Sequence, residues 1–222
     1  MLSLIITESA LELVPKELLH HPSVVSSAKK FAKKPAEMLL DNSWHFAAMK
    51  GIKNENKRGR PDLVHFSLLE ATSIPLYFEN QIKIYVHTVN DKVILVGDGV
   101  HLPKSFHRFA GLAEKLFREK LIISENNRLL ELKDMDFESL IDLIDPKKII
   151  GLDTDGRPST YGEVAGHLDD DSCLIVGGFQ KGHFSEPTQD RIDEIFKVEG
   201  TSLESHVILG RILYEYEKTI FM

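Results

Sequence analysis

The chain has 222 residues and a mass of 25.2 kDa, enough for one large domain but too little for two ordinary domains and a linker. Hydrophobic residues make up 42% and charged residues 27%, which excludes a disordered chain or a fibrous repeat. No apolar run approaches the roughly 20 residues that cross a bilayer, and the first residues lack the basic start of a secretion signal. The one cysteine, Cys173, excludes an intrachain disulfide and a cysteine-based zinc site. We therefore expect a single domain over residues 1–222 that is cytoplasmic and contacts no membrane.

Charge is unevenly distributed around the net value of −7. Residues 29–60 hold nine lysines and arginines against three carboxylates, whereas residues 163–217 hold twelve carboxylates against four lysines and arginines. Such asymmetry is typical of a protein that meets a polyanion with one face only. The basic segment therefore makes nucleic-acid contact a working hypothesis, against the alternative that surface charge is simply uneven.

The first part of the chain predicts one strand followed by short helices. Residues 2–7 are apolar and β-branched, which indicates a buried strand. Pro15 is expected to open a helical stretch that Pro22 interrupts and Pro35 ends, and a helix is expected around residues 43–49.

The middle of the chain changes its period twice. Residues 51–61 predict a polar loop, and Asp62 begins an amphipathic helix that it would cap. Residues 76–97 are rich in β-forming side chains, with a turn signal at Asn90-Asp91, and predict a hairpin. Residues 101–120 return to the helical period, with Pro103 in the first turn.

The last third alternates strands and helices. We expect strands at residues 148–153, 172–178 and 195–200, and helices at residues 137–144, 161–167, 188–194 and 203–218. This alternation predicts an α/β domain with a largely parallel sheet, to which the hairpin at 76–97 would be an elaboration.

Three loops that follow these strands are rich in small residues: residues 152–157, 177–182 and 199–203. In an open α/β sheet, ligands bind at the carboxyl ends of the strands, and glycine lets them reach the main chain. The spacing fits neither a phosphate loop nor a dinucleotide fingerprint. The loops therefore predict a small-molecule cleft, although any single one of them could merely make a turn.

The segment K-R-G-R-P-D at 57–62 places two guanidinium groups, those of Arg58 and Arg60, beside a glycine. Such forks match phosphate geometry. Asp62 either caps the next helix or holds Arg58 or Arg60 in a fixed pose. As a general base it would be weak, since pairing with a cation lowers the pKa of a carboxyl group.

Lys104 and Arg108 lie four residues apart on one expected helix, with His101 just before it. A cationic face at a helix start suits phosphate contact, and the alternative is an ordinary solvated face. The ten histidines have no partners at ligand spacing, so we expect no metal.

Three stretches together resemble a known family: KRGRPDLVHF at 57–66, HLPKSFHRFAGL at 101–112 and IVGGFQKG at 175–182. The chain is similar over nearly its whole length to the ribosome-biogenesis pseudouridine-N1 methyltransferases of the SPOUT, or α/β-knot, superfamily. Its short N-terminus resembles the archaeal form.

The resemblance implies a sheet whose C-terminal segment threads a trefoil knot, S-adenosylmethionine as cofactor, a homodimer, and a pseudouridine in a loop of small-subunit rRNA as substrate. Residues matching the family's cofactor loops are Leu152, Val176, Gly177, Gly178, Gly182, Val198, Glu199, Gly200, Thr201, Ser202 and Leu203. Residues matching its RNA face are Arg58, Arg60, His101, Lys104 and Arg108.

These observations favour methylation of N1 of pseudouridine, with a role in biogenesis of the small ribosomal subunit. Asp62 is a catalytic candidate by location only, and a water molecule or an RNA phosphate could equally accept the proton. Two alternatives stay open: an RNA-binding assembly factor whose methylation is secondary, or a knotted methyltransferase acting on another base.

The last expected helix also bears on assembly. Its apolar surface is wide, with Leu203, Val207, Gly210 and Tyr214 in one stripe and Leu209, Leu213, Tyr216 and Ile220 in another. One side of a sheet does not cover so wide a surface, so we expect this helix to pack on its own core and on a second subunit, with Gly210 at the close approach. The alternative is an internal helix in a monomer.

Overall fold

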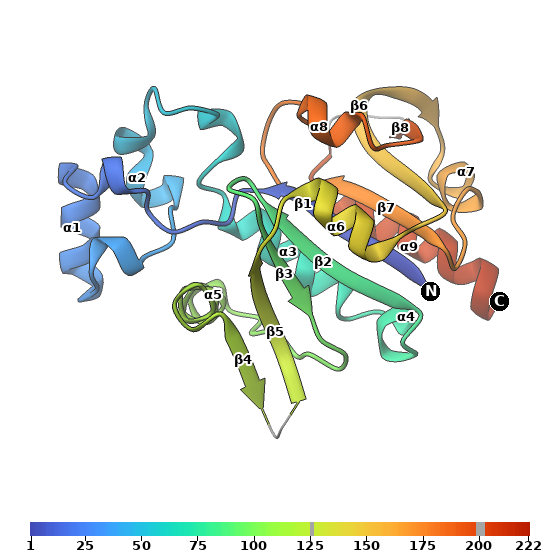
Figure 1. Cartoon of the computed structure of the whole chain (residues 1–222), viewed down its shortest axis with the longest axis horizontal. Coiled ribbons are helices and arrows are strands. Elements are labelled where there is room, and N and C mark those ends of the chain that lie inside the picture. Colours follow the sequence, from blue (N-terminus) through green and yellow to red (C-terminus); the bar gives the residue numbers. More distant parts are fainter. Residues whose placement is uncertain (125–126, 199–202) are drawn as a thin grey trace.

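The computed structural model describes residues 1–124, 127–198 and 203–222. Their strands form one eight-stranded sheet with the order β4-β5-β3-β2-β1-β7-β6-β8 (Figure 1). The α/β class, with a mixed and mostly parallel core, is as the alternation of elements predicts.

The parallel part of the sheet holds the strands on which the cleft depends. Its members are β1 (Leu2–Ser9), β2 (Ile82–Thr88), β7 (Ser172–Gly177), β6 (Lys148–Ser159) and β8 (Glu194–Val198). β1 is central and pairs with both β2 and β7, while β6 pairs with β7 and β8. A strand buried on both faces needs a continuous apolar run, which explains why β1 is readable from sequence.

The other part of the sheet is antiparallel. β2 turns into β3 (Lys92–Val96) at the expected Asn90-Asp91 turn, and β3 pairs with β5 (Asn127–Asp134), which pairs with β4 (Leu121–Ser124). The hairpin is narrower than residues 76–97, because Pro75 begins the short helix α4 (Pro75–Phe78). It is also not an appendage, since β2 lies in the sheet beside β1. The β4–β5 pair is an addition that the sequence reasoning missed.

Helices cover both faces of the sheet. The larger core lies under α3 (Pro61–Ala71), α5 (Phe106–Glu119), α7 (Tyr161–Gly166) and α9 (Ser205–Phe221). The smaller core lies under α6 (Phe137–Ile144). Leu4 and Ile6 of β1 belong to the larger core and Ile5 to the smaller one, so alternate residues of one strand serve both faces.

The N-terminal helices form a separate cluster beside the sheet (Figure 1). They are η1 (Lys16–Leu18), α1 (Pro22–Phe31), η2 (Pro35–Glu37), α2 (Asn42–Met49) and η3 (Glu55–Lys57). Pro22 begins α1 instead of interrupting a helix, as suits a residue without a backbone N–H.

Two expected helices have different bounds. The helix expected at 188–194 is α8 (Glu186–Gln189), because Asp193 is held by backbone and side-chain hydrogen bonds to Ile149 of β6. The expected helix over 101–120 starts only at Phe106. The trefoil knot stays a prediction, since residues 199–202 between β8 and α9 lie outside the described residues. Within the described ranges, no helix has the length and apolar character needed to span a membrane.

Candidate functional site

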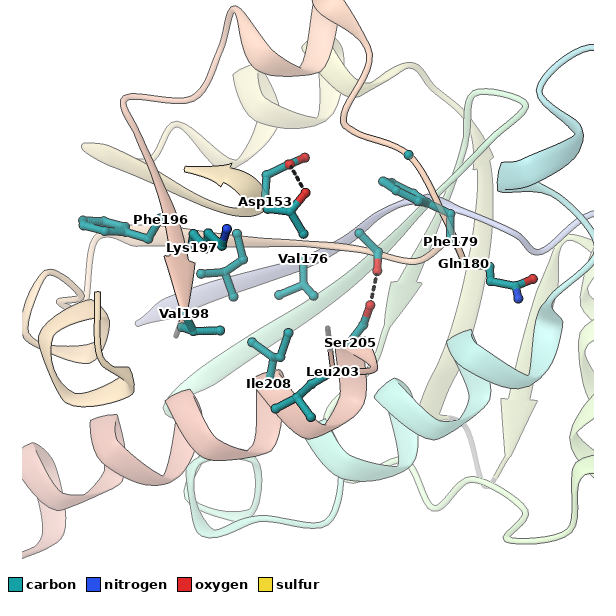
Figure 2. A pocket seen from close by; sticks show the side chains of 14 residues that line it. Asp153, Val176, Phe179, Gln180, Phe196, Lys197, Val198, Leu203, Ser205 and Ile208 are labelled. Carbon is teal, nitrogen blue, oxygen red and sulfur yellow. Dashed lines mark hydrogen bonds between the residues drawn. The ribbon is translucent and has the colours of Figure 1, made fainter. Parts of the chain in front are cut away.

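A cavity of about 300 Å³ lies where β7 and β8 end, beside residues 152–154 in the middle of β6, where β6 stops pairing with β7 (Figure 2). Six of the residues expected to bind cofactor line it: Leu152, Val176, Gly177, Gly182, Val198 and Leu203. Glu199, Gly200, Thr201 and Ser202, also expected there, lie outside the described residues. Residues of all three expected loops therefore meet at this cavity, although residues 152–157 are not a loop but part of β6, which runs on to Ser159.

The walls of the cavity differ in character. Val176, Leu203 and Ile208 make an apolar wall, whereas Asp153 and Lys197 bring charged groups to it (Figure 2). The Ser205 hydroxyl at the start of α9 donates a hydrogen bond of 2.7 Å to the carbonyl oxygen of Gly177, tying the helix to the end of β7. An apolar wall with a few polar groups suits a ligand that has a flat ring at one end and charges at the other.

Gly178 does not line this cavity. Its N–H donates to the Thr7 carbonyl and its own carbonyl accepts from Ala10, both at 2.8 Å. A Cβ at this position would lie 2.2 Å from Ser9 Oγ and 2.8 Å from Ser9 Cα. Position 178 is therefore a glycine because β1 passes against it. Gly178, expected to contact the cofactor, is not one of the residues that line the cavity.

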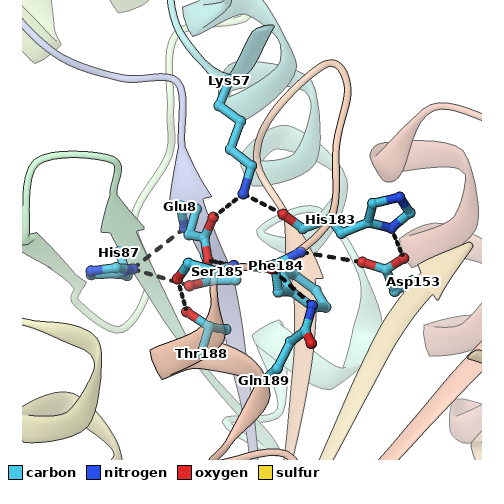
Figure 3. Close-up of polar contacts among 10 residues, drawn as sticks. Glu8, Lys57, His87, Asp153, His183, Phe184, Ser185, Thr188 and Gln189 are labelled. Carbon is cyan, nitrogen blue, oxygen red and sulfur yellow. Dashed lines mark hydrogen bonds and ion pairs between the residues drawn. The ribbon is translucent and has the colours of Figure 1, made fainter. Parts of the chain in front are cut away.

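Lys57 anchors the loop between β7 and α8 from one side (Figure 3). Its ammonium group lies 2.5 Å from Glu8 Oε2, donates to the carbonyl of His183, and sits 4.5 Å from the centre of the Phe179 ring. The other Glu8 oxygen accepts the Ser185 N–H at 2.7 Å. Burial alone would raise the pKa of Glu8, but the hydrogen bonds from Lys57 and Ser185 outweigh it and hold that pKa below its usual range.

A second anchor holds the same loop from the side of β6. His183 Nδ1 lies 2.7 Å from Asp153 Oδ1, and Asp153 Oδ2 accepts the Phe184 N–H at 3.3 Å (Figure 3). The hydrogen bond to Asp153, with added attraction from Asp155, raises the pKa of His183. One ligand atom each of Asp153, Asp155 and His183 lie within 4.8 Å of one another. We interpret this trio as a loop anchor, and the expectation of no metal stays a prediction.

Arg58 is built into the fold and does not present its charge to RNA. Its guanidinium makes two hydrogen bonds to the carboxylate of Glu12, at 2.6 and 2.7 Å. The two side chains are only 9% and 3% exposed. Sequence alone showed a cation beside a glycine, but not the carboxylate 46 residues earlier that neutralises it.

Arg60 and Asp62 form a bidentate pair, with distances of 2.8 and 2.7 Å. Arg60 itself is the N-cap residue of α3, Pro61 is the first helical residue, and Asp62 lies in the first turn. Asp62 is thus not the N-cap, because its carboxylate is turned to the guanidinium. Of the two roles considered for it, holding an arginine in a fixed pose is the one that the geometry supports.

His101, Lys104 and Arg108 are exposed, and within the described ranges their side chains make no ion pair or hydrogen bond. Lys104 does not share a helix with Arg108 as expected. α5 begins only at Phe106, and the segment before it is tied to α3 by a 2.7 Å hydrogen bond that His65 Nε2 donates to the Pro103 carbonyl. The two cations are free to meet a polyanion, from a loop and a helix respectively.

Several lining residues were not singled out in advance. Asp153, Thr154, Phe179 and Gln180 lie inside two of the expected loops and could have been found by taking those loops whole. Phe196, Lys197, Ser205 and Ile208 could not, because nothing local distinguishes a residue at the end of β8 or the start of α9 from any other strand or helix residue.

Fold and site together define an α/β protein with a ligand cleft at the carboxyl ends of parallel strands and free cations outside it. The family described as EMG1/NEP1 methyltransferase matches residues 4–217, and the chain belongs to this family.

Individual relatives match along their whole length. The chain is 36% identical to the ribosomal RNA small subunit methyltransferase Nep1 of Thermococcus sibiricus, covering 99% of both chains. It is 38% identical to the Nep1 of Sulfurisphaera tokodaii, covering 96% of this chain and 94% of that one. Among solved structures, Archaeoglobus fulgidus Nep1 bound to S-adenosylhomocysteine superposes with a TM-score of 0.86 at 35% identity, covering 97% of each chain.

Proposed function

We propose that the protein transfers a methyl group from S-adenosylmethionine to N1 of a pseudouridine in small-subunit rRNA. The observation that carries this proposal is the cavity at the ends of β7 and β8, beside β6, in a chain of the EMG1/NEP1 family. Full-length relatives are named small-subunit rRNA methyltransferases, and a solved relative binds S-adenosylhomocysteine, the demethylated form of this methyl donor.

The cavity residues fit this group. The apolar wall of Val176, Leu203 and Ile208 would receive the adenine ring, and Asp153 would face a positively charged part. S-adenosylmethionine supplies a methyl group already activated by its sulfonium. The protein therefore mainly has to orient the two reactants and keep the cleft shaped, which the loop anchors at Lys57 and His183 do.

The RNA would approach over Arg60, His101, Lys104 and Arg108. Asp62 fixes the Arg60 guanidinium, so that its remaining donors point in one direction. We assign Asp62 this positioning role. The proton of N1 would then leave to a water molecule or an RNA phosphate. Pseudouridine is joined to its sugar through carbon, so N1 carries a hydrogen and can be methylated, unlike N1 of uridine.

We further propose that the enzyme works as a homodimer and in the cytoplasm, where it would meet rRNA during biogenesis of the small subunit. The dimer is supported by apolar side chains left exposed on α3 and α9, Phe66 at 44% and Tyr214 at 53%.

The test is a methylation assay with labelled S-adenosylmethionine and two hairpin RNAs that differ only in carrying uridine or pseudouridine in the loop. Label should enter the pseudouridine RNA alone, and digestion with mass spectrometry should place it on N1. Arg108→Ala should weaken RNA binding and lower its salt dependence by about one unit of slope, as for one lost phosphate contact. Arg118→Ala, at the far end of α5, is the control. Label in the uridine RNA, or none in either, would overturn the proposal.

A further inference from the structure

A second pocket lies on the other side of the loop after β7, which borders the cofactor cavity. It is a groove of about 250 Å³ between α2, η3 and the loop after β7, and Gln180 lines both it and the cofactor cavity. Ligand pockets usually span ~300–1,000 Å³, so this groove suits one base better than a whole ligand. We call it the α2 groove.

One wall of the α2 groove is aromatic and open to solvent. Asn42, Phe46 and Met49 recur at helical spacing and so share one face of α2. Phe46 is 62% exposed, and the ammonium group of Lys50 lies 5.6 Å from the centre of its ring. An exposed aromatic ring beside a cation is the combination on which single-stranded nucleic acids stack their bases.

The opposite wall supplies polar groups and charge. Within the described residues, the side-chain amides of Asn56 and Gln180 on this wall, and of Asn42 on the α2 wall, make no hydrogen bond, and amides can pair with base edges. Glu55 is occupied by the N–H of Gly51 at 2.8 Å, and Arg58 by Glu12. Glu55 keeps its negative charge, and the exposed Lys181 and Lys50 outnumber it, so the net charge at the groove is positive.

The two walls are held at a fixed separation. The Asn42 N–H donates 2.8 Å to the carbonyl of Gly59, and Gly59 has the positive φ of 67°. A Cβ on Gly59 would lie 2.6 Å from Met49 Cε, so the loop presses directly on α2. The groove is part of the folded frame and adjoins both the arginine segment and the cofactor cavity.

We propose that the α2 groove holds an unpaired RNA nucleotide next to the methylated one, with its base stacked on Phe46. This proposal rests on the proposed function, because the base that is methylated would bind at the cofactor cavity, on the other side of the loop that contains Gln180. Proteins recognise RNA loops by binding neighbouring unstacked bases in separate sites. The α2 groove, which shares Gln180 with the cofactor cavity, offers such a site for the second base. Binding there would fix the register of the RNA and so select which nucleotide is methylated.

The test combines a variant with a modified RNA. The probe is a fluorescent hairpin RNA with one pseudouridine in its loop, together with versions in which each neighbour of the pseudouridine is replaced in turn by an abasic nucleotide. Phe46→Ala should weaken binding of the intact hairpin about tenfold, the loss expected for one stacked base. One of the abasic hairpins should bind the wild-type protein about tenfold more weakly than the intact hairpin does. The Phe46→Ala variant should bind that abasic hairpin and the intact hairpin with the same affinity.

Phe46→Trp should keep the affinity, and Phe78→Ala, which removes an equally exposed ring from α4, should not change it. Affinity for S-adenosylhomocysteine, measured by calorimetry, should be the same in all variants. Unchanged RNA binding by Phe46→Ala overturns the proposal, and so does a loss that is the same for intact and abasic hairpins. Failure of the proposed function looks different, since wild type would then methylate no pseudouridine hairpin.

Discussion

At the scale of single residues, two buried carboxylates near the start of the chain decide what the basic segment does. Glu8 and Glu12 are neutralised by Lys57 and Arg58, neighbours in the chain. Two of the three cations between residues 57 and 60 are therefore neutralised inside the protein, and the third, Arg60, is 18% exposed and paired with Asp62. Counting the lysines and arginines of this segment therefore overstates the positive charge that is available to bind RNA.

Replacing Arg58 should destabilise the protein without touching the RNA face directly. In Arg58→Ala, Glu12 keeps only the Asn90 amide, at 2.6 Å, as partner for a buried charge. Breaking such a pair costs about 3 kcal/mol. Urea unfolding should show this loss, and the double variant Arg58→Met with Glu12→Leu should recover most of it. If the single variant is as stable as wild type, the pair is not a structural one.

Gly178 should matter for folding more than for cofactor contact. Gly178→Ala drives a methyl group into Ser9 of β1, and overpacking of this kind costs ~1–3 kcal/mol. Gly111→Ala is the matched control, because a Cβ there meets nothing within 4 Å in the middle of α5. That control should gain up to about 1 kcal/mol from helix propensity. Equal melting temperatures for the two variants would show that β1 and the loop are further apart than the structure has them.

At the scale of elements, the loop from 178 to 185 is the part of the site that the rest of the protein holds in place. Lys57 holds it from the N-terminal helices and Asp153 holds it from β6. The two anchors should respond differently to pH, because the pKa of Glu8 is lowered and the pKa of His183 is raised.

The His183 anchor should make cofactor binding weaken as pH rises. Its pKa is raised above the ordinary 6.5, so the anchor is complete below that pH and is lost as pH rises through the raised value. The groups that face His183 are Asp153, Asp155 and the more distant Lys57. The Glu8 carboxylate, by contrast, stays charged throughout, since its pKa is lowered below 4.5.

Calorimetry with S-adenosylhomocysteine between pH 6 and 9 tests this. Wild type should lose affinity towards the alkaline end, while His183→Gln should bind with the same, weaker affinity across the range. A wild-type affinity that does not vary with pH would mean that the protonated anchor does not shape the cavity.

Elements with a buried apolar run were predictable, and elements that depend on their partners were not. β1, β6 and β7 lie inside the sheet, and each carries a buried apolar run: residues 4–6, residues 149–150 and residues 173–176. β5 lies towards the sheet edge and alternates buried Leu130 and Leu132 with half-exposed Glu131 and Lys133. This short alternation is hard to recognise in sequence because it lies within a polar stretch. In the site, loops after strands were foreseeable from chain order, whereas the Arg58–Glu12 pair joins distant residues and needed coordinates.

At the scale of the whole molecule, α3 and α9 run side by side, and their packing corrects one detail of the expected dimer. A Cβ on Gly210 would lie 2.4 Å from Glu70 Oε1, so this glycine serves contact between α3 and α9 of one chain. Of the two stripes on α9, the one with Leu209, Leu213 and Tyr216 is buried in the chain's own core. The other stripe leaves Tyr214 53% exposed.

The dimer should form through that remaining surface. Phe66 of α3 lies beside His206 of α9, with ring centres 5.3 Å apart, so its exposed ring and that of Tyr214 belong to one α3–α9 surface. Exposed apolar side chains gathered in this way mark an interface, and in a two-fold dimer the same surface serves both copies. Sedimentation at micromolar protein should therefore give about twice the 25.2 kDa of one chain.

Tyr214→Glu should shift the protein towards the single-chain mass, because two like charges would face each other across the two-fold axis. Leu143→Glu is the matched control: Leu143 is 55% exposed, but it lies on α6, over the opposite face of the sheet. It should leave the mass unchanged. A wild type that sediments as one chain, or a dimer that survives Tyr214→Glu and yields to Leu143→Glu, would move the interface away from α9.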